Sequence, residues 1–399
     1  MEDFLQRGLA QTTLHPLNLN VSSASGVYFH LEDGTKMLDF VSGIGVSSFG
    51  HSNPDIVEAL HQQIDRHLHV MVYGEVQQKA QDLAASRLLG LLPKSLDAVY
   101  FVNSGAEAID GALKLARKVT GRKGFIAMEG GYHGNTFGAL SISSNQDRRA
   151  PFEPMLDGVQ FVPFNHEDAL LAIDGTQAAV IAETVQGDAG IRIPDSAWIQ
   201  RLEKRCNETG TLLILDEIQC GIGRTGKPFA FEHFNVTPDI LCLGKALGGG
   251  MPLGAFISSA SRMRTLATQP DLGHLTTFGG HPVACASSAA AMKLLGKIDW
   301  KALELRGARL ENQLKAHSVV KAVRRLGYFI AVDMDSPEAI HFCVEHARKN
   351  GLLIFYFLST PHSFRIAPPL TISDAELDEG MTLLSHAFDA WALRHGSHP

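Results

Sequence analysis

The sequence predicts an α/β protein with a large domain built on a mostly parallel central sheet and a small α+β domain. Two observations carry this prediction. Between residues 98 and 257, apolar runs of strand length alternate with stretches of helix length, which is the pattern of repeated β-α units. From residue 327 onward the pattern changes, and strands and helices follow one another in a different order. The length of 399 residues is also enough for two domains of roughly 150 residues or more each.

The N-terminal region is expected to begin with a β-hairpin that joins the small domain. Strands over residues 27–30 and 36–40 flank the turn signal Asp33-Gly34. A helix is expected over residues 54–68, with Asn53 as its N-cap, and a second helix over residues 78–91.

The central region supplies the sheet, and the C-terminal region supplies the small domain. Central strands are expected over 98–102, 124–127, 159–162, 179–182, 211–215, 240–243 and 254–257, with helices over 107–119 and 198–209. Helices over 282–295 and up to residue 314 follow, and then strands over 327–332, 352–357 and 363–366 with helices over 337–350 and 374–393. We therefore expect a large domain of residues 49–294 and a small domain of residues 1–48 and 295–399.

The charge and the apolar pattern argue against two classes of partner. The net charge is −7 and no basic stripe is present, so we expect no nucleic-acid partner. No apolar run approaches the roughly 18 residues needed to span a bilayer, so we expect no membrane partner. Five scattered cysteines and an acidic start, Met1-Glu2-Asp3-Phe4, without an apolar signal core favour a reducing cytoplasmic location.

Asp216 ends a strongly apolar run, Thr211-Leu-Leu-Ile-Leu-Asp216. In open α/β sheets, ligands bind at the carboxyl ends of strands. A buried carboxylate there needs a positive partner, and a protonated pyridine nitrogen would serve. An ordinary ion pair or a metal-binding acid are equally open interpretations of this segment alone.

Lys245 follows another strand and stands among small residues, in Leu243-Gly-Lys245-Ala-Leu-Gly-Gly-Gly250. Small neighbours leave room for a flat ring, and a partly desolvated amine has a lowered pKa that favours Schiff-base chemistry. The alternative is a surface lysine in a flexible loop, which is the more frequent case for an isolated motif of this kind.

Asn103-Ser104-Gly105-Ala106-Glu107 joins a strand to the start of a helix. Free backbone N–H groups and the helix dipole favour a phosphate at such a point, and Ser104 adds a hydroxyl. An ordinary capped helix start explains the same residues. Gly221-Ile-Gly223-Arg-Thr-Gly226 fits a dinucleotide-binding pattern, but it neither follows its strand directly nor opens a helix, so we reject that interpretation. The 18 histidines show no zinc-like spacing, and no metal is expected.

Taken together, these segments resemble the class III aminotransferases, which are pyridoxal-5′-phosphate (PLP) enzymes of fold type I. The resemblance runs from Gly26-Val-Tyr to Arg365-Ile-Ala-Pro-Pro369. It rests on motifs that occur in the family's order: Asn103 to Glu107, Gly131-Tyr-His-Gly134, Glu183 to Gly190, Asp216-Glu-Ile-Gln219, Leu243 to Leu247 and Thr277-Phe-Gly-Gly280.

The resemblance implies a role for each matching residue. Lys245 would form the Schiff base with PLP, and Asp216 would pair with the pyridine nitrogen. The other cofactor-binding residues would be Ser104, Gly105 and Ala106 at the phosphate, Tyr132 stacked on the ring with His133 beside it, Glu183, Gln219 at the ring hydroxyl, and Thr277 at the phosphate of the neighbouring subunit. Thr277 thus implies a homodimer with shared active sites.

The same resemblance implies amino transfer from an ω-amino acid or amine to a 2-oxo acid such as 2-oxoglutarate or pyruvate, by ping-pong kinetics through pyridoxamine phosphate. Arg365 matches the arginine that binds the carboxylate of the 2-oxo acid. Asp188 stands where many members carry a glutamate that covers this arginine. An aminomutase, racemase or decarboxylating aminotransferase is the alternative within the family, and a catalytically silent protein is disfavoured because Lys245 and Asp216 are both present.

Three positions depart from the family pattern. Asn135 follows His-Gly, where acetylornithine, ornithine and 4-aminobutyrate aminotransferases usually carry an arginine for the donor's carboxylate. This departure favours a donor whose carboxylate is placed differently or is absent. Thr184 replaces a usual proline, and His281 replaces a usual asparagine.

Overall fold

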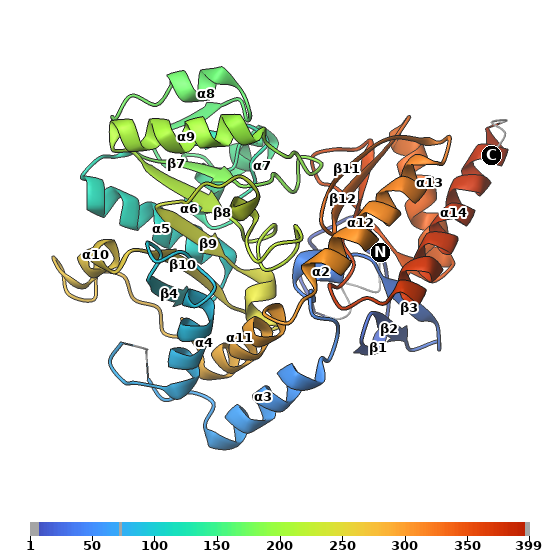
Figure 1. Cartoon of the computed structure of the whole chain (residues 1–399), viewed down its shortest axis with the longest axis horizontal. Coiled ribbons are helices and arrows are strands. Elements are labelled where there is room, and N and C mark those ends of the chain that lie inside the picture. Colours follow the sequence, from blue (N-terminus) through green and yellow to red (C-terminus); the bar gives the residue numbers. More distant parts are fainter. Residues whose placement is uncertain (1–7, 72–73, 396–399) are drawn as a thin grey trace.

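The computed structural model describes residues 8–71 and 74–395, and in Figure 1 it forms two lobes. One lobe holds the central sheet with its helices. The other lobe combines the C-terminal elements, drawn in orange and red, with the N-terminal strands β1 to β3, drawn in blue. Residues 1–4, whose acidic character entered the prediction of location, lie outside the described residues.

The central sheet has seven strands in the order β4-β10-β9-β8-β7-β5-β6. Their bounds are β4 Ala98–Val102, β5 Gly124–Met128, β6 Val159–Val162, β7 Gln177–Glu183, β8 Leu212–Asp216, β9 Ile240–Leu243 and β10 Gly254–Ser258. The pairs from β6 through β5, β7 and β8 to β9 are parallel, as the β-α pattern predicts. Strand β10 is antiparallel to both β9 and β4, because the short connection after β9 leaves no room for a crossover helix.

Helices cover this sheet. They are α3 Pro54–Arg66, α4 Lys79–Leu89, α5 Gly105–Thr120, α6 Phe137–Ser141, α7 Gln146–Arg149, α8 Glu167–Leu171, α9 Ser196–Thr209, α10 Ala260–Met263 and α11 Pro282–Leu295. Helices α3, α4 and α11 lie in the lower part of the same lobe in Figure 1. The predicted N-cap of α3 is confirmed, since the Asn53 side chain accepts from the Asp55 N–H at 3.1 Å. Helix α5 lies against β4, β9 and β10, and α11 packs on α3 and α4.

The second lobe contains two four-stranded sheets, in the orders β1-β2-β3-β13 and β11-β12-β15-β14. Their strands are β1 Val21–Ser25, β2 Tyr28–Leu31, β3 Lys36–Asp39, β11 Val320–Leu326, β12 Phe329–Met334, β13 Leu352–Leu353, β14 Phe355–Tyr356 and β15 Ser363–Ile366. Helices α2 Ser42–Gly45, α12 Trp300–Lys315, α13 Pro337–Lys349 and α14 Asp374–Arg394 accompany them. Strand β13 pairs in parallel with β3, so the N-terminal hairpin does join the C-terminal elements.

One expectation for this lobe was wrong in detail, and two of its strands were not predicted. The single strand expected over 352–357 is divided at Ile354, because β13 pairs with β3 in one sheet and β14 pairs with β15 in the other. Strands β1 and β11 were missed, since only their antiparallel partners β2 and β12 make them strands. The domain boundaries at residues 49 and 294 stay a prediction.

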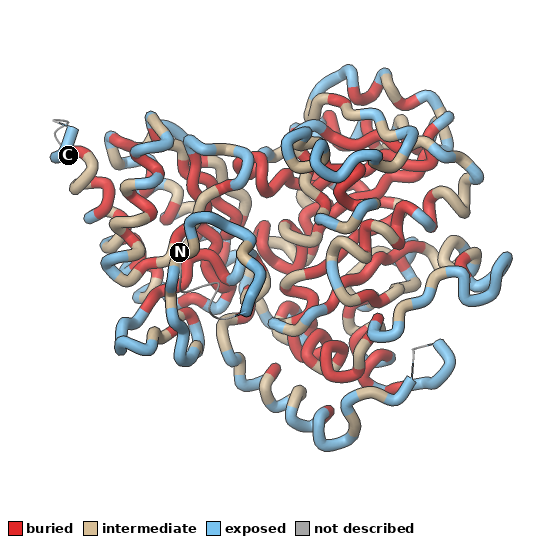
Figure 2. Tube along the Cα trace, turned by 180° about the vertical axis from the view of Figure 1, so that it is seen from behind, coloured by how far each residue is buried: buried red, intermediate tan, exposed pale blue. Residues whose placement is uncertain are grey.

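The strands of the central sheet direct their carboxyl ends to one edge, where Glu183 ends β7, Asp216 ends β8 and Lys245 follows β9. Buried residues fill the interior of both lobes (Figure 2). The buried strands β8 and β9 are apolar until their last residue or the loop that follows. The fold therefore brings isolated polar groups together at the edge of an apolar sheet. Within the described residues, no helix is long and apolar enough to cross a membrane.

Candidate active site

A cavity of about 240 Å³ lies at the carboxyl edge of the sheet. Most of the residues that the sequence predicted for the site line this cavity. Its lining is Gly105, Ala106, Tyr132, His133, Gly134, Asn135, Glu183, Asp216, Ile218, Gln219, Cys220 and Lys245. Gly134, Ile218 and Cys220 were not predicted as site residues, although Gly134 and Ile218 lie in motifs that were singled out and Cys220 directly follows Gln219.

Lys245 is partly accessible from the cavity, while the surrounding protein desolvates its amine. Burial lowers the pKa of Lys245 to about 8, against the opposing attraction of Asp216. Its backbone φ is +45°, in the left-handed region that a lysine rarely adopts. The turn at Ser42–Gly45 approaches it, since a Cβ built on Gly45 would lie 4.0 Å from the Lys245 Cδ. These features do not fit a surface lysine in a flexible loop.

Asp216 is buried and pairs with His133, with 2.7 Å between Oδ2 and the imidazole Nδ1. The other carboxylate oxygen accepts from the Ile218 N–H at 2.9 Å. No group of three or more potential metal ligands occurs among the described residues. His133 Nε2 is buried and has no hydrogen-bond partner in the described structure.

Glu183 fixes the loop that carries Tyr132 and His133. Its Oε1 accepts from the Tyr132 N–H at 3.0 Å, and its Oε2 accepts from the Gly187 N–H at 2.8 Å. Burial raises the pKa of Glu183 to about 7. The electrostatic interaction with His133 opposes this shift, and the negative charge of Asp216 adds to it. Glu183 thus acts on the site through the backbone of its neighbours.

The start of helix α5 forms one wall of the cavity. Ser104 is the N-cap, and its hydroxyl oxygen accepts from the Glu107 N–H at 3.2 Å. Gly105 and Ala106 occupy the first turn, whose amides lack intrahelical acceptors. Gly134 closes against this turn with φ +130°, and a Cβ there would lie 2.7 Å from the Ala106 Cβ. Ser104 itself is exposed and does not line the cavity.

Arg365 and Asp188 form a buried pair beside the cavity, 3.6 Å apart between the guanidinium Nη2 and Oδ1. Burial lowers the pKa of Arg365 to about 10, so the group stays charged at neutral pH. The Arg365 Nε donates to the Tyr356 carbonyl at 3.2 Å, and the guanidinium lies 4.5 Å from the centre of the Phe357 ring. Its charge also lowers the pKa of Lys245, so the two groups are electrostatically coupled.

The departures from the family pattern have local structural explanations. Asn135 is exposed at the mouth of the cavity, and its amide donates to the Tyr132 hydroxyl at 3.2 Å. The Thr184 hydroxyl donates to Glu217 Oε1 at 2.9 Å, and both residues are fully buried. His281 is the N-cap of α11, where its Nδ1 accepts from the Val283 N–H at 3.3 Å, and asparagine commonly fills such a position.

The resemblance implies that Thr277 acts at the phosphate of the neighbouring subunit, and this role stays a prediction for the single chain. Thr277 is exposed, it does not line the cavity, and its carbonyl contacts the His69 imidazole at 3.2 Å. Gln219 does line the cavity, and a Cβ on Gly187 would lie 2.2 Å from its Oε1.

Comparison with known proteins agrees with this arrangement. The sequence model of the family described as Aminotransferase class-III matches residues 9–388. The chain belongs to the class III aminotransferase family. It is a PLP-dependent transaminase of fold type I.

Several relatives of this class III aminotransferase are similar over nearly their full length. A protein of Methanopyrus kandleri named acetylornithine aminotransferase is 40% identical over 90% of this chain and 91% of its own. A Bacillus subtilis protein of the same name is 35% identical over 93% and 95%. The structure of ornithine aminotransferase from Toxoplasma gondii, which has PLP at partial occupancy in its active site, gives a TM-score of 0.89 at 30% identity, covering 98% of this chain and 94% of that one.

The described residues fit PLP. A buried imidazole nitrogen, His133 Nε2, lacks a partner, and Lys245 supplies an amine of lowered pKa. The first turn of α5 offers amides to a phosphate, and Gly134 keeps that wall free of a side chain.

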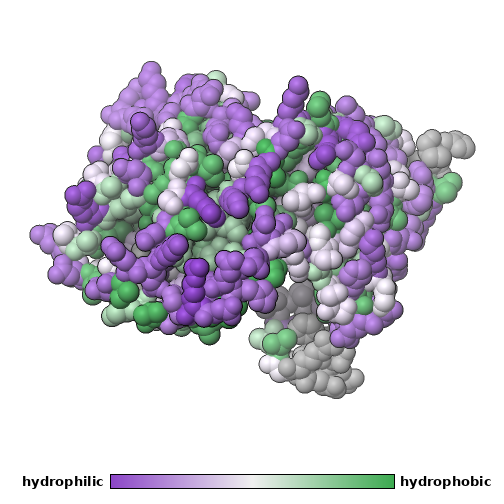
Figure 3. All heavy atoms as spheres, turned by 60° about the horizontal axis from the view of Figure 1, so that its bottom comes forward, coloured by the Kyte–Doolittle hydropathy of each residue, from purple (hydrophilic) through white to green (hydrophobic). Residues whose placement is uncertain are grey.

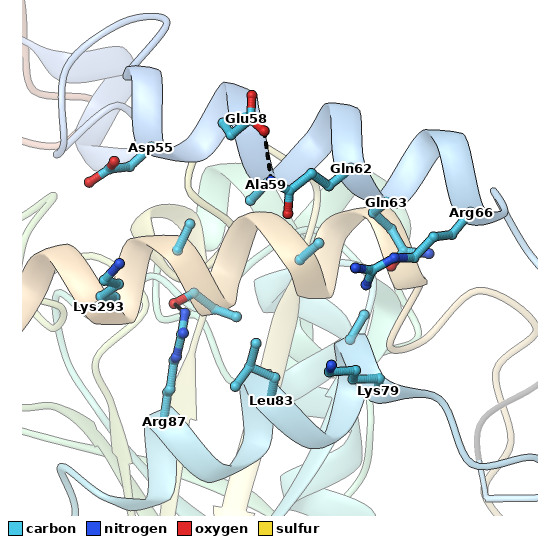
Figure 4. A pocket seen from close by; sticks show the side chains of 14 residues that line it. Asp55, Glu58, Ala59, Gln62, Gln63, Arg66, Lys79, Leu83, Arg87 and Lys293 are labelled. Atoms are coloured by element: carbon cyan, nitrogen blue, oxygen red, sulfur yellow. Dashed lines mark hydrogen bonds between the residues drawn. The ribbon is translucent and has the colours of Figure 1, made fainter.

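A second hollow among the described residues of this class III aminotransferase lacks such a set. The groove in Figure 4 lies between α3 and α4, with α11 as its floor. Charged and amide side chains line it, and Arg87 donates to the Ala289 carbonyl at 2.6 Å. None of its lining residues is a predicted site residue.

Proposed function

We propose that this class III aminotransferase moves an amino group from an ω-amino acid or amine to a 2-oxo acid such as 2-oxoglutarate or pyruvate. The observation that carries this proposal is the buried guanidinium of Arg365, which is paired with one carboxylate at 3.6 Å and is coupled electrostatically to Lys245. A buried arginine next to an amine of lowered pKa suits a substrate with a carboxylate at a fixed distance from its reacting carbon.

We assign the cofactor contacts to the residues around the cavity. When bound, PLP supplies the electron sink for the reaction. Asp216, oriented by His133, would hold the ring nitrogen, and Gln219 would contact the ring hydroxyl. Tyr132 would cover one face of the ring, and Ser104, Gly105 and Ala106 would hold the phosphate. Glu183 keeps Tyr132 in place through the backbone bond at 3.0 Å.

Lys245 carries the proton transfer in this proposal. Its Nζ would hold the cofactor covalently. When it is free and neutral, the same Nζ would take a proton from the substrate carbon that bears the amino group. A pKa of about 8 leaves a usable neutral fraction near neutral pH.

Fewer residues of the proposed site specify the amino donor than specify the 2-oxo acid. Asn135 can form hydrogen bonds but brings no charge to the mouth of the cavity. The guanidinium of Arg148 lies 5.7 Å from the centre of the Tyr132 ring. A positive charge is therefore present on helix α7 and absent from position 135, which supports a donor whose carboxylate is placed differently or is absent.

The deciding experiment follows the visible absorbance of the PLP enzyme while single donors are added without an acceptor. N-acetylornithine, ornithine, 4-aminobutyrate and simple diamines form the panel. We expect an ω-amine to bleach the band and 2-oxoglutarate or pyruvate to restore it, and Lys245→Ala to abolish both changes. Turnover of a donor without any acceptor, or release of carbon dioxide, would contradict amino transfer.

We further propose a homodimer with shared active sites. Two segments that meet at the His69 and Phe278 rings expose large apolar side chains, namely Leu68, Val70, Met71, Leu272, Leu275 and Phe278. Figure 3 shows green hydrophobic atoms among purple ones on the face that it presents. Exposed Thr277 belongs to one of these segments, which supports a role at the partner's site rather than at its own.

Complementation between two inactive variants tests the shared site. Lys245→Ala and Thr277→Asp are prepared separately and then mixed under conditions that exchange subunits. A shared site predicts that mixed dimers regain activity, because one of their two sites contains both intact residues. A monomeric mass in solution, or no recovery after confirmed exchange, would refute the proposal.

A further inference from the structure

The carboxylate of Asp188 is held more closely by Leu358 and Ser359 than by Arg365. Its Oδ1 accepts from the Leu358 N–H at 2.9 Å, and its Oδ2 accepts from the Ser359 hydroxyl at 2.7 Å. The distance from Oδ1 to the Arg365 guanidinium is 3.6 Å, which is longer than a charge-assisted hydrogen bond. The backbone carbonyl of Asp188 also accepts from the Thr360 hydroxyl at 3.4 Å.

These contacts join two separate parts of the fold. Asp188 lies in the turn after β7 of the central sheet, whereas Ser359 lies between β14 and β15, and β15 carries Arg365. Asp188 is 6% exposed. The side chain is therefore desolvated, and its two anchoring hydrogen bonds offset part of the cost of burying its charge.

We propose that Ser359 is a positioning residue that latches Asp188 beside Arg365 and so sets how readily Arg365 accepts the carboxylate of a 2-oxo acid. The inference rests on the proposed function and adds a residue to the substrate site. A latched Asp188 partly neutralises Arg365 and repels an incoming carboxylate. When the latch is released, Asp188 can leave the pair, and the guanidinium is free for the acceptor.

The short side chain of aspartate explains why a latch is needed here. Asp188 does not reach Arg365 within hydrogen-bond distance, so the ion pair alone orients it weakly. The Ser359 hydroxyl and the Leu358 N–H each bind a different carboxylate oxygen, which fixes the rotation of the group. No local sequence pattern indicates this contact, because Asp188 and Ser359 are separated by 171 residues.

The first test measures binding of glutarate, a dicarboxylate that can neither donate nor accept an amino group, to the PLP enzyme by calorimetry. Ser359→Ala removes one charge-assisted hydrogen bond from the latched state, and we expect glutarate to bind about three- to tenfold more tightly than in the wild type. Ser359→Thr keeps the hydroxyl and should bind as the wild type does. Unchanged or weaker binding to Ser359→Ala would overturn the proposal.

The second test compares the two half-reactions. We expect Ser359→Ala to lower the KM for the 2-oxo acid by a similar factor, with little change in kcat, and to speed the reverse half-reaction with glutamate relative to that with an uncharged amine. Thr360→Ala, which removes only the backbone contact at 3.4 Å, is the matched control and should leave these ratios unchanged. In an Asp188→Ala background, Ser359→Ala should have no further effect.

The outcomes separate this inference from the proposed function. Wild-type protein that transfers no amino group would refute the proposed function, whatever Ser359 does. Active wild type with identical glutarate binding and KM in Ser359→Ala would refute the latch alone. Ser359 is exposed, so the alanine variant is expected to fold, and its thermal unfolding checks this directly.

Discussion

His133 Nδ1 lies 2.7 Å from Asp216 Oδ2, and both side chains are buried at the edge of the central sheet. The pairing fixes the orientation of a carboxylate whose other oxygen is already bound by the Ile218 N–H. It leaves His133 Nε2 without a partner in the described structure. The carboxylate is therefore positioned by two groups before any ligand is bound.

Removal of either partner is expected to lower the rate of amino transfer. Asp216→Asn removes the charge that would stabilise a protonated ring nitrogen in the proposed function, and we expect kcat to fall by about 10²–10⁴-fold. His133→Ala leaves Asp216 charged but free to rotate, so its loss of kcat should be smaller. Single-turnover kinetics measure both effects. Losses that simply multiply in the double variant would contradict the idea that His133 acts through Asp216.

The rate at which apoenzyme takes up PLP should depend on pH through Lys245. Only the neutral amine attacks an aldehyde, and with a pKa of about 8 roughly a tenth of Lys245 is neutral at pH 7. The uptake rate should therefore rise with pH and level off above about 8, whereas an unperturbed lysine would give a rise that continues to about 10.5. Stopped-flow absorbance measures the rate.

The same profile has an internal control. The negative charge of Asp216 raises the pKa of Lys245, so Asp216→Asn should move the midpoint of the uptake rate to lower pH. A midpoint that stays near 10 in both proteins would show that the Lys245 amine is not desolvated.

Restoring a positive charge at position 135 should broaden the range of donors. Asn135→Arg places a guanidinium at the mouth of the cavity, and a charge-assisted bond to a donor carboxylate should raise kcat/KM for ornithine-type donors by about 10- to 100-fold. Asn135→Gln is the neutral control and should give no gain. If Asn135→Arg gains nothing while uncharged amines still react, position 135 does not face the donor carboxylate.

We expect Arg224 to stabilise the contact between the two lobes. Its fully buried guanidinium donates to the Pro368 carbonyl at 2.6 Å, the Ser48 hydroxyl at 2.8 Å and the Tyr328 carbonyl at 3.3 Å. Arg224→Met leaves buried acceptors without a donor, and we expect the free energy of unfolding to fall by about 3 kcal/mol or more.

Chemical denaturation measures this loss of stability. Arg201→Met is the matched control, because Arg201 pairs with Glu167 on the surface and such pairs contribute about 0–1 kcal/mol. Equal shifts in the two variants would contradict the assigned role of Arg224. The Gly221 to Gly226 segment, whose nucleotide-binding interpretation was rejected from the sequence, would then have no stabilising role through this residue.

The sequence by itself determined the class of fold, most of the strands and helices, and most of the residues that line the cavity. Those features depend on local patterns, since an apolar run that ends in Asp216 or is followed by Lys245 is visible along the chain. The parallel sheet then brings such ends to one edge without further information. The pattern could also divide the chain into two parts, because the β-α alternation stops before residue 327.

Only the tertiary structure decided which distant groups meet. Ser359 holds Asp188, Thr184 holds Glu217, and Arg224 joins Ser48 to Pro368, although no local pattern links these positions. The division of residues 352–357 between two sheets likewise depends on partners far away in the chain. The physical reason is that hydrogen-bond partners of buried polar groups are selected by packing in three dimensions, whereas strand and helix periodicity is set by neighbours along the chain.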